Sequence, residues 1–245
     1  MATKNTIAFI TGGNRGIGLE TARELGKKGI TVILGARDAK KGEEAVALLQ
    51  REGITAEAVV HDTARPETDR KVFEQLEARH GKLDILVNNA GANFENLLSS
   101  DSSTVTEKDL QRTFDVNFFS VIRLTQTLLP LLRKSEAGRI VNLSSVLGSL
   151  GVQSSPTSPI APAKALAYNA SKTALNAFTV HLAAELADTK IKVNSAHPGW
   201  VKTELGGPHA QDDLQGSART SVFLATLPAD GPTGGFFHKE DRLPW

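Results

Sequence analysis

The chain has no cysteine among its 245 residues. This absence excludes disulfide bonds, thiolate metal ligands and a cysteine nucleophile, and it fits a reducing compartment. No apolar run reaches the roughly 18 residues that a membrane-spanning helix requires, so no membrane association is expected. The apolar stretch from Thr6 to Ile10 is also too short for the core of a signal peptide. These absences predict a cytoplasmic protein.

An excess of charge of either sign is also missing. The chain has 28 Lys and Arg against 27 Asp and Glu, a formal net charge of +1. This balance gives no broad basic field for a phosphate backbone, so nucleic acid is not an expected partner. The six histidines show no spacing typical of paired metal ligands, and no metal site is predicted.

Length and composition indicate one folded domain over residues 1–245, with 40% hydrophobic and 22% charged residues. Short runs rich in Val and Ile alternate with longer helical patterns, which is typical of a parallel sheet covered on both faces. The predicted strands are residues 6–10, 31–35, 56–61, 83–88, 138–143, 191–196 and 234–237. The sequence therefore predicts an α/β protein with a doubly wound Rossmann fold and a seven-stranded parallel sheet.

A glycine-rich turn follows the first predicted strand and leads into a helix. Residues 11–18 read TGGNRGIG, with the spacing Gly-x-x-x-Gly-x-Gly. Glycines permit a tight turn and let the backbone approach a pyrophosphate, while the helix N-terminus offers free N–H groups. A turn that binds nothing would need the same glycines, but the strand before and the helix after favour a dinucleotide site. The candidate cofactor-binding residues here are Gly12, Asn14, Arg15, Gly16, Ile17 and Gly18.

Arg37 indicates which dinucleotide binds. It follows the second predicted strand 19 positions after Gly18, near the interval at which the adenosine ribose is contacted. An acidic residue would favour NAD there, whereas a guanidinium suits a 2′-phosphate, which Arg15 could contact from the other side. NADPH is therefore the predicted cofactor. Two observations oppose this: Asp38 could reach the ribose hydroxyls, and Arg37 could be an exposed cation at a helix start.

Tyr168 is the only tyrosine, and Lys172 follows it four positions later in an Ala-rich helical segment. At this spacing the two side chains share one helix face. A phenol with an ordinary pKa of about 10 needs a neighbour that favours its ionised form before it exchanges protons readily near neutral pH. An ammonium is such a neighbour. Alone, however, such a pair is more often ordinary packing beside a solvent-exposed face.

Further motifs accompany this pair. Together they are Thr11-Gly-x-x-x-Gly16-x-Gly18, Asn88-Asn89-Ala90-Gly91, Asn117, Ser145, Tyr168-x-x-x-Lys172 and Pro198-Gly199. In this order, over nearly the whole chain, they resemble the motifs of the short-chain dehydrogenase/reductase family. The resemblance is specific, because no packing requirement asks for all of these motifs together. Residues 36–38, ARD, and 198–203, PGWVKT, are most similar to the carbonyl reductases within that family.

The resemblance implies a role for each matching residue. Tyr168 would protonate the carbonyl oxygen during reduction. Lys172 would lower the pKa of Tyr168 and bond the nicotinamide ribose, and Ser145 rather than Ser144 would hold the substrate oxygen. Asn117 would anchor a water that leads from Lys172 to solvent. Without the other motifs, Asn117 would be interpreted as a core amide whose hydrogen bonds are satisfied.

The resemblance also implies further cofactor contacts. The adenosine would be bordered by Asn89, Ala90 and Gly91 and bonded at its adenine amine by Asp62, and the nicotinamide side would be contacted by Pro198, Gly199, Val201 and Thr203. Asp62 could equally cap the next turn of the chain.

The substrate side is less defined. Ser145 and Tyr168 are 23 positions apart, more than in many members of the family, so the proline-containing loop at residues 149–162 carries an insertion. Because this insertion is intermediate in size, a homodimer, a homotetramer and a monomer all stay open. Trp200 is a candidate substrate contact together with Ser145 and Tyr168, or a buried core side chain.

Together these residues predict an NADPH-dependent carbonyl reductase that transfers hydride to an aldehyde, ketone or quinone. The same residues would serve an NADP-dependent dehydrogenase that oxidises a secondary alcohol. A non-catalytic NADPH-binding regulator is a third hypothesis, but it would not need the set of Ser145, Tyr168 and Lys172.

Overall fold

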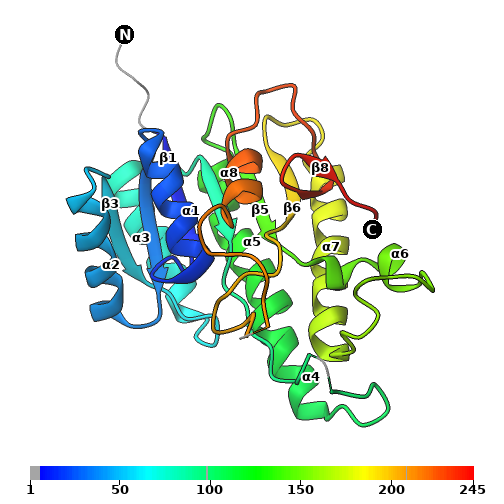
Figure 1. The fold of residues 1–245 in the computed structure, drawn as a ribbon. Coiled ribbons are helices and arrows are strands. Elements are labelled where there is room, and N and C mark those ends of the chain that lie inside the picture. The colour runs from blue at the N-terminus through cyan, green and yellow to red at the C-terminus, as the bar shows by residue number, and fades with distance from the viewer. Residues whose placement is uncertain (1–5, 98, 208) are drawn as a thin grey trace.

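Eight strands form one central sheet in the computed structural model, which describes residues 6–97, 99–207 and 209–245 (Figure 1). The strands are β1 Ile7–Thr11, β2 Thr31–Ala36, β3 Ala56–Val60, β4 Ile85–Asn88, β5 Arg139–Leu143, β6 Lys192–His197, β7 Phe236–His238 and β8 Asp241–Arg242. Their order is β3-β2-β1-β4-β5-β6-β7-β8, and every neighbouring pair is parallel except β7 with β8. The predicted doubly wound α/β fold is confirmed.

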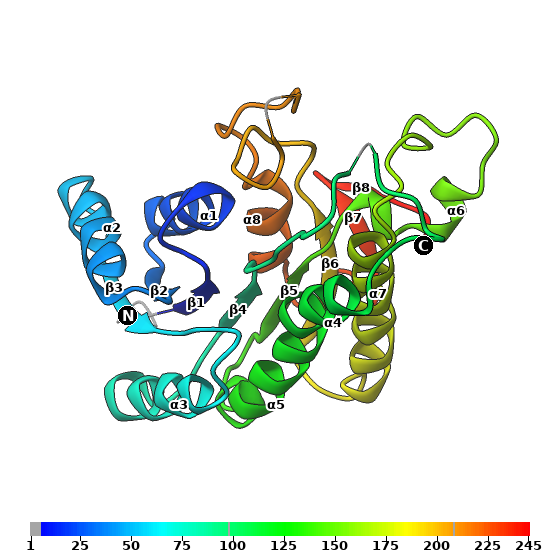
Figure 2. The same cartoon turned by 90° about the horizontal axis from the view of Figure 1, so that it is seen from below.

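Helices cover both faces of the sheet (Figure 2). One face carries α1 Gly16–Lys27, α2 Ala39–Arg51 and α8 Arg219–Ala225, and the other carries α3 Glu67–His80, α5 Ser120–Leu132 and α7 Leu166–Glu185. The helix α4 Glu107–Phe114 leads through a π-helical turn, Asp115–Phe119, into α5, and β5 is followed by a 3₁₀ turn, Val146–Gly148, and by α6 Leu150–Gln153. Within the described residues, no helix is both long and apolar enough to cross a membrane.

The sheet separates two hydrophobic layers. Along β1, Ala8 and Ile10 pack in the layer beneath α1, α2 and α8, while Ile7 and Phe9 pack in the layer against α3, α5 and α7. Successive residues of a strand point to opposite faces, so a strand that is buried on both faces must be apolar at every position. This is why the parallel strands appear in the sequence as continuous apolar runs.

The prediction of seven parallel strands is wrong in one respect, because an eighth strand, β8, pairs antiparallel with β7. Both residues of β8, Asp241 and Arg242, are exposed. The chain reverses before it at Lys239, whose φ of 56° lies in the left-handed region. A polar two-residue strand at the edge of a sheet has no apolar pattern, so periodicity could not reveal it.

The loop predicted at residues 149–162 contains one short helix. Ser149 begins α6, because its hydroxyl accepts a hydrogen bond from the Val152 N–H at 3.1 Å. The rest of the segment consists of turns and irregular backbone, as its prolines predict.

The chain changes direction across the sheet between β1 and β4. From β1 the chain proceeds to β2 and β3 on one side, whereas β4, β5 and β6 lie on the other. Connections that leave the C-terminal ends of β1 and β4 therefore diverge, and open α/β sheets bind ligands at this point.

Candidate active site

The predicted site residues follow the C-terminal ends of six parallel strands. Gly12 follows β1, Arg37 follows β2, Asp62 follows β3, Asn89 follows β4, Ser145 follows β5 and Pro198 follows β6. Because the strands are parallel, these ends share one edge of the sheet. The residues expected to contact the adenosine phosphate and base lie on the β2–β3 side, and those expected to contact nicotinamide and substrate lie on the β5–β6 side.

The glycine turn has a backbone that glycine alone adopts easily. Gly12 and Gly16 have φ angles of 61° and 55°, in the left-handed region that side chains disfavour. At Gly18 the reason is close packing, since a Cβ there would lie 2.5 Å from both the Gly12 carbonyl oxygen and Asn89 Nδ2. The turn thus brings backbone against backbone, and a side chain at Gly18 would push it apart.

The helix that starts in this turn leaves its N-terminus open. Within the described residues, Arg15 at the N-cap of α1 gives no side-chain cap, and the first helical turn contains no acidic residue. Asn14 and Ile17, which complete the turn, are half-buried. The N–H groups and the partial positive charge of this helix end are therefore available to an anion. A cradle of glycines at an open helix end fits a dinucleotide pyrophosphate.

Asn89 ties the end of β4 to the glycine turn. Its Nδ2 donates to the Thr11 carbonyl at 2.7 Å, and its backbone N–H and that of Ala90 each donate to the Thr11 hydroxyl at 2.9 Å. Gly91 lies farther along, where a Cβ would come within 3.5 Å of Lys172 Nζ. The segment thus joins the glycine turn to the Lys172 side of the site. Sequence reasoning placed Thr11 in a motif but gave its hydroxyl no role.

Arg37 is exposed immediately beyond β2 and makes no hydrogen bond or ion pair with the described part of the chain. Asp38, the alternative ribose contact, accepts from the Lys41 N–H at 3.1 Å and so caps α2. A carboxylate engaged at a helix start is less available to a ribose, whereas the guanidinium of Arg37 is free for an anion.

Arg15, the second cation expected at the phosphate, is paired with Glu204. This ion pair joins the glycine turn to the loop after β6, and both side chains are largely exposed. Thr203 lies at the same place, since a Cβ at Gly16 would come within 3.7 Å of Thr203 Cγ2. The loop after β6 therefore lies against the beginning of α1.

Asp62 caps a turn, as the alternative interpretation of the sequence allowed. Its Oδ1 accepts from the Ala64 N–H at 3.1 Å, and its own N–H donates to Thr68 Oγ1 at the same distance. Its contact with an adenine amine stays a prediction.

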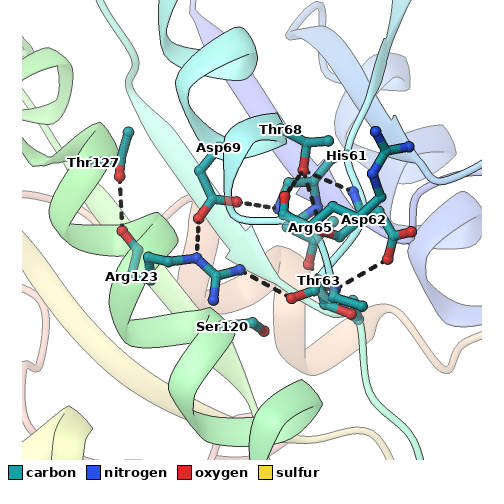
Figure 3. A network of polar contacts seen from close by, with 12 residues as sticks. His61, Asp62, Thr63, Arg65, Thr68, Asp69, Ser120, Arg123 and Thr127 are labelled. Atoms are coloured by element: carbon teal, nitrogen blue, oxygen red, sulfur yellow. Dashed lines mark hydrogen bonds and ion pairs between the residues drawn. The ribbon is translucent and has the colours of Figure 1, made fainter.

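A network of polar and charged side chains, centred on the buried His61 and Asp69, holds the loop that contains Asp62 (Figure 3). Arg123 of α5 donates to Asp69 Oδ2 at 2.6 Å and to the Thr63 carbonyl at 2.9 Å. Asp69 Oδ1 is 3.1 Å from His61 Nε2. The network spans α3, α5 and the end of β3, and sequence reasoning missed it because its members are far apart in the chain.

Tyr168 lies in the first turn of α7, with 7% of its surface exposed. Burial raises the pKa of its hydroxyl to about 12, against the opposing effect of a hydrogen bond with Ser145. The sequence suggested that Lys172 lowers this pKa, but burial outweighs any such effect in the chain alone. At neutral pH the phenol is therefore protonated, as a proton donor must be.

Lys172 lies one helical turn after Tyr168 and is 4% exposed. Its Nζ donates to the Leu143 carbonyl at 2.7 Å and lies 5.6 Å from the centre of the Tyr168 ring. Burial lowers the pKa of Lys172 to about 8. The spacing of four residues places both side chains on one helix face, as predicted.

Ser145, and not Ser144, faces this pair. The Ser145 side chain lies near enough to the Tyr168 hydroxyl to lower its pKa, and its Oγ accepts from the Leu147 N–H at 3.2 Å. Ser144 Oγ is directed instead to the Lys172 backbone carbonyl, at 3.4 Å. Neighbouring residues of extended backbone point to opposite sides, so only one of two adjacent serines can face the phenol.

The turn after Ser145 packs directly on α7. A Cβ at Gly148 would lie 2.7 Å from the backbone carbonyl carbon of Lys172. Thr173 Oγ1 and Asn176 Nδ2 both donate to the Gly148 carbonyl, at 3.0 and 3.3 Å. Sequence reasoning missed Gly148, and a glycine three residues after the serine was the only available signal.

His197, at the end of β6, supports the same turn from the other side. Its Nδ1 accepts from the Val146 N–H at 3.3 Å. Burial and the neighbouring His238 lower the pKa of His197 to about 3, so the ring is neutral. The neutral ring therefore serves this turn as a hydrogen-bond acceptor. Among the described residues, no group of three or more His, Asp or Glu side chains is placed to hold a metal ion.

Asn117 is fully buried in the π-helical turn between α4 and α5. Its Oδ1 accepts from the Ala92 N–H, and its Nδ2 donates to the Ala92 carbonyl, both at 2.8 Å. The second Nδ2 hydrogen goes to Ser171 Oγ at 3.0 Å. The side chain is therefore a satisfied core amide whose donors are both engaged, and the anchoring of a water by Asn117 stays a prediction.

The segment after β6 is held by Asp212. Gly199 has a φ of 95°, and a Cβ there would lie 2.5 Å from Asp212 Oδ2. That carboxylate accepts from the Trp200 N–H at 2.8 Å, and the indole Nε1 donates to the Gly206 carbonyl at 2.9 Å. Trp200 is 38% exposed, so the alternative of a buried core side chain is wrong.

The rest of this segment leads back to the glycine turn. Pro198 is half-buried, and Val201 is buried and forms a short β-bridge with Asp212. Thr203 Oγ1 accepts from the Gly206 N–H at 3.1 Å. Contacts of these residues with a nicotinamide carboxamide stay a prediction.

Comparisons with known proteins agree on the family. The family model described as short chain dehydrogenase matches residues 6–214. Carbonyl reductase (NADPH) 1 of Mus musculus is 31% identical over 283 residues, which cover 100% of both chains. Salutaridine reductase of Papaver bracteatum is 33% identical over 300 residues, covering 96% of this chain and 94% of that protein.

Solved structures share the fold. The NADPH-bound carbonyl reductase from chicken fatty liver has a TM-score of 0.85 at 25% identity and covers 99% of this chain and 100% of its own. The carbonyl reductase Sniffer of D. melanogaster has a TM-score of 0.83 at 28% identity, with the same coverage. The chain belongs to the short-chain dehydrogenase family and is an oxidoreductase.

Proposed function

We propose that this chain is an NADPH-dependent carbonyl reductase that transfers hydride to an aldehyde, ketone or quinone, with Tyr168 as the general acid. One observation carries the proposal: Ser145 and Lys172 are both buried beside the phenol of Tyr168, at the ligand-binding edge of the sheet. Relatives named as carbonyl reductases, similar over their whole length, support the same reaction.

NADP(H) rather than NAD(H) is supported by two cations. Arg37 is exposed and free at the end of β2, and Arg15 lies at the start of α1. Two guanidinium groups suit a 2′-phosphate, and a carboxylate that would suit a free ribose is engaged at Asp38. When bound, the cofactor supplies the hydride. The glycine turn would hold its pyrophosphate, and Lys172 would bond its ribose.

Tyr168 and Ser145 would act on the oxygen of the substrate. Two hydroxyl donors that face one oxygen stabilise the negative charge that develops there as the carbon is reduced. The raised pKa of Tyr168 keeps its proton in place until that charge forms. Tyr168 then gives its proton to the oxygen, which is downhill because an alkoxide is a stronger base than a phenolate. An ammonium at Lys172 would stabilise the phenolate left behind.

A second candidate is the reverse reaction, the oxidation of a secondary alcohol. It is supported by the (+)-neomenthol dehydrogenase of Capsicum annuum, which is 30% identical over 312 residues and covers 98% of this chain. Oxidation requires Tyr168 to be ionised before it accepts a proton. Because the pKa of Tyr168 is about 12 in the chain alone, the phenol near neutral pH is in the protonated state that reduction requires.

The test is a panel of aldehydes, ketones and quinones, assayed by the loss of NADPH absorbance and repeated with NADH. We expect turnover of at least one carbonyl with NADPH, and slower turnover of the same carbonyl with NADH. Turnover of secondary alcohols with NADP⁺ alone would support the second candidate. Absence of turnover in either direction, despite tight NADPH binding, would support a non-catalytic regulator.

A further inference from the structure

The helix that carries Tyr168 begins without a cap of its own. Ala165 occupies the N-cap position of α7, where it has no side-chain acceptor, and the first turn contains no acidic residue. The first N–H groups of a helix have no partner within it, and an N-cap side chain normally accepts from the second or third residue. In α7 the third residue is Tyr168. The backbone N–H that Ala165 leaves without an acceptor is therefore that of Tyr168, the proposed general acid.

Glu95 supplies the missing acceptor from a distant part of the chain. Its Oε2 accepts from the Tyr168 backbone N–H at 3.2 Å, although the two residues are 73 positions apart. A turn holds Glu95 in place, because its N–H donates to Asn93 Oδ1 at 3.1 Å and Asn93 Nδ2 donates to its carbonyl at 2.9 Å. Beside it, the Lys164 N–H donates to the Leu97 carbonyl at 3.0 Å. The segment after β4 therefore binds the beginning of α7 at two points.

The carbonyl of Tyr168 is tied to the same segment. Ser171 Oγ donates to that carbonyl at 2.7 Å, and Asn117 Nδ2 donates to Ser171 Oγ at 3.0 Å. Asn117 in turn bonds both backbone groups of Ala92, three residues before Glu95. Both backbone groups of Tyr168 are thus fixed to the segment that begins at the end of β4.

We infer that Glu95 is a positioning residue, which caps α7 and holds Tyr168 in place beside Ser145 and Lys172. A carboxylate is well suited to this place, since a negative charge is favourable at a helix N-terminus. Its second oxygen, Oε1, is buried without a hydrogen-bond partner among the described residues. Burying an unsatisfied oxygen is costly, so stability alone does not explain a glutamate here. The inference rests on the proposed role of Tyr168.

The single tyrosine of the chain makes the contact directly measurable. Isotope-labelled tyrosine gives one backbone amide signal in an NMR spectrum, that of Tyr168, and its hydrogen exchange needs no turnover. In Glu95→Ala we expect exchange at least about tenfold faster than in the wild type, because the amide loses its acceptor. In Glu95→Gln, whose side-chain oxygen still accepts, we expect exchange within about threefold of the wild type.

Turnover should follow the same order. With NADPH and a reducible carbonyl, kcat of Glu95→Ala should fall about tenfold because a misplaced acid reaches fewer productive geometries. The dissociation constant for NADPH should not change, and Glu95→Gln should recover most of kcat. Glu107→Ala is the matched control, since Glu107 is an exposed acid in the first turn of α4, and it should leave exchange and kcat unchanged.

Three further variants separate the possible outcomes. Glu95→Asp keeps the charge but retracts the acceptor, and it replaces Glu95→Ala in the comparison if that variant does not fold. Wild-type exchange in Glu95→Ala, or equal losses in Glu95→Ala and Glu95→Gln, overturns the inference. Ala165→Ser in the Glu95→Ala background restores an N-cap oxygen and should slow exchange again. Full turnover in Tyr168→Phe would instead refute the proposed function. The hydrogen-exchange measurements on the Glu95 variants need no turnover, so they would still test whether Glu95 caps α7.

Discussion

Lys172 Nζ is bound to the Leu143 carbonyl at 2.7 Å and lies 5.6 Å from the centre of the Tyr168 ring. Leu143 is the last residue of β5, two positions before Ser145. One lysine therefore joins the helix that carries the phenol to the strand that carries the serine. This contact fixes the three polar groups of the proposed reaction as one unit.

In the protein without cofactor, Tyr168 should titrate at an unusually high pH. Burial raises the pKa of Tyr168 to about 12, so the phenolate should appear well above the ordinary pKa of about 10. Because Tyr168 is the only tyrosine, the ultraviolet absorbance of the phenolate reports this residue alone. The chain unfolded in urea, with its phenol in water, is the control. A folded-state midpoint at or below that of the unfolded chain would contradict the burial of the hydroxyl.

Lys172→Met should alter how stability depends on pH. Burial lowers the pKa of Lys172 from 10.5 to about 8, so between these values the unfolded chain binds a proton that the folded chain does not. The wild type should therefore gain stability as pH rises from about 8 to 10.5, by at most about 3 kcal/mol, and Lys172→Met should lack this gain. Urea unfolding of both proteins across this range measures the difference. Parallel curves would show that the amine is not desolvated.

The backbone of the glycine turn and the place of Arg37 at the end of a strand could be predicted because their signals are local. The glycines of residues 11–18 require a particular backbone, and Arg37 directly follows a strand whose apolar run marks where it ends. The roles of Ser145, Tyr168 and Lys172 came from the resemblance to a family rather than from a local signal, and they stay predictions. The sequence offered Asp38 only as a ribose contact, whereas in the structure its carboxylate caps α2.

The features of the site that could not be predicted depend on contacts between segments that are distant in the sequence. Glu95 has no neighbouring motif, and its acceptor role appears only when the segment after β4 meets the start of α7. The network of His61, Asp69 and Arg123 joins three elements and has no periodicity. The direction of the Tyr168 pKa shift was also beyond the sequence, because the spacing shows a nearby ammonium but not how deeply the phenol is buried.

Glu204→Gln should strengthen NADPH binding. The carboxylate of Glu204 pairs with Arg15, the residue proposed to contact the 2′-phosphate, so the two anions compete for one guanidinium. Exposed ion pairs contribute about 0.2–1 kcal/mol, so the dissociation constant for NADPH should fall about 1.4- to 5-fold at low salt. Titration calorimetry at two salt concentrations measures the effect, which should shrink at the higher one. Weaker binding in this variant would mean that Glu204 supports the site.

Arg37→Glu should reverse the preference between the two cofactors. A carboxylate at the end of β2 repels a 2′-phosphate and accepts from the ribose hydroxyl of NADH. The ratio of kcat/KM for NADPH to that for NADH should fall by at least about a hundredfold, as expected when a charge-assisted contact becomes a repulsion. Arg70→Glu, at an exposed position on α3 outside the proposed contacts, is the control. An unchanged ratio would remove Arg37 from the phosphate site.

The most direct test of the account is Tyr168→Phe, which removes a single oxygen from the buried pair with Lys172. Turnover of a carbonyl substrate with NADPH should fall about 10²- to 10⁴-fold, because the general acid is lost, while the dissociation constant for NADPH stays near that of the wild type. Both quantities can be measured on one preparation, by steady-state assay and by calorimetry. A variant that keeps wild-type turnover would contradict Tyr168 as the proton donor.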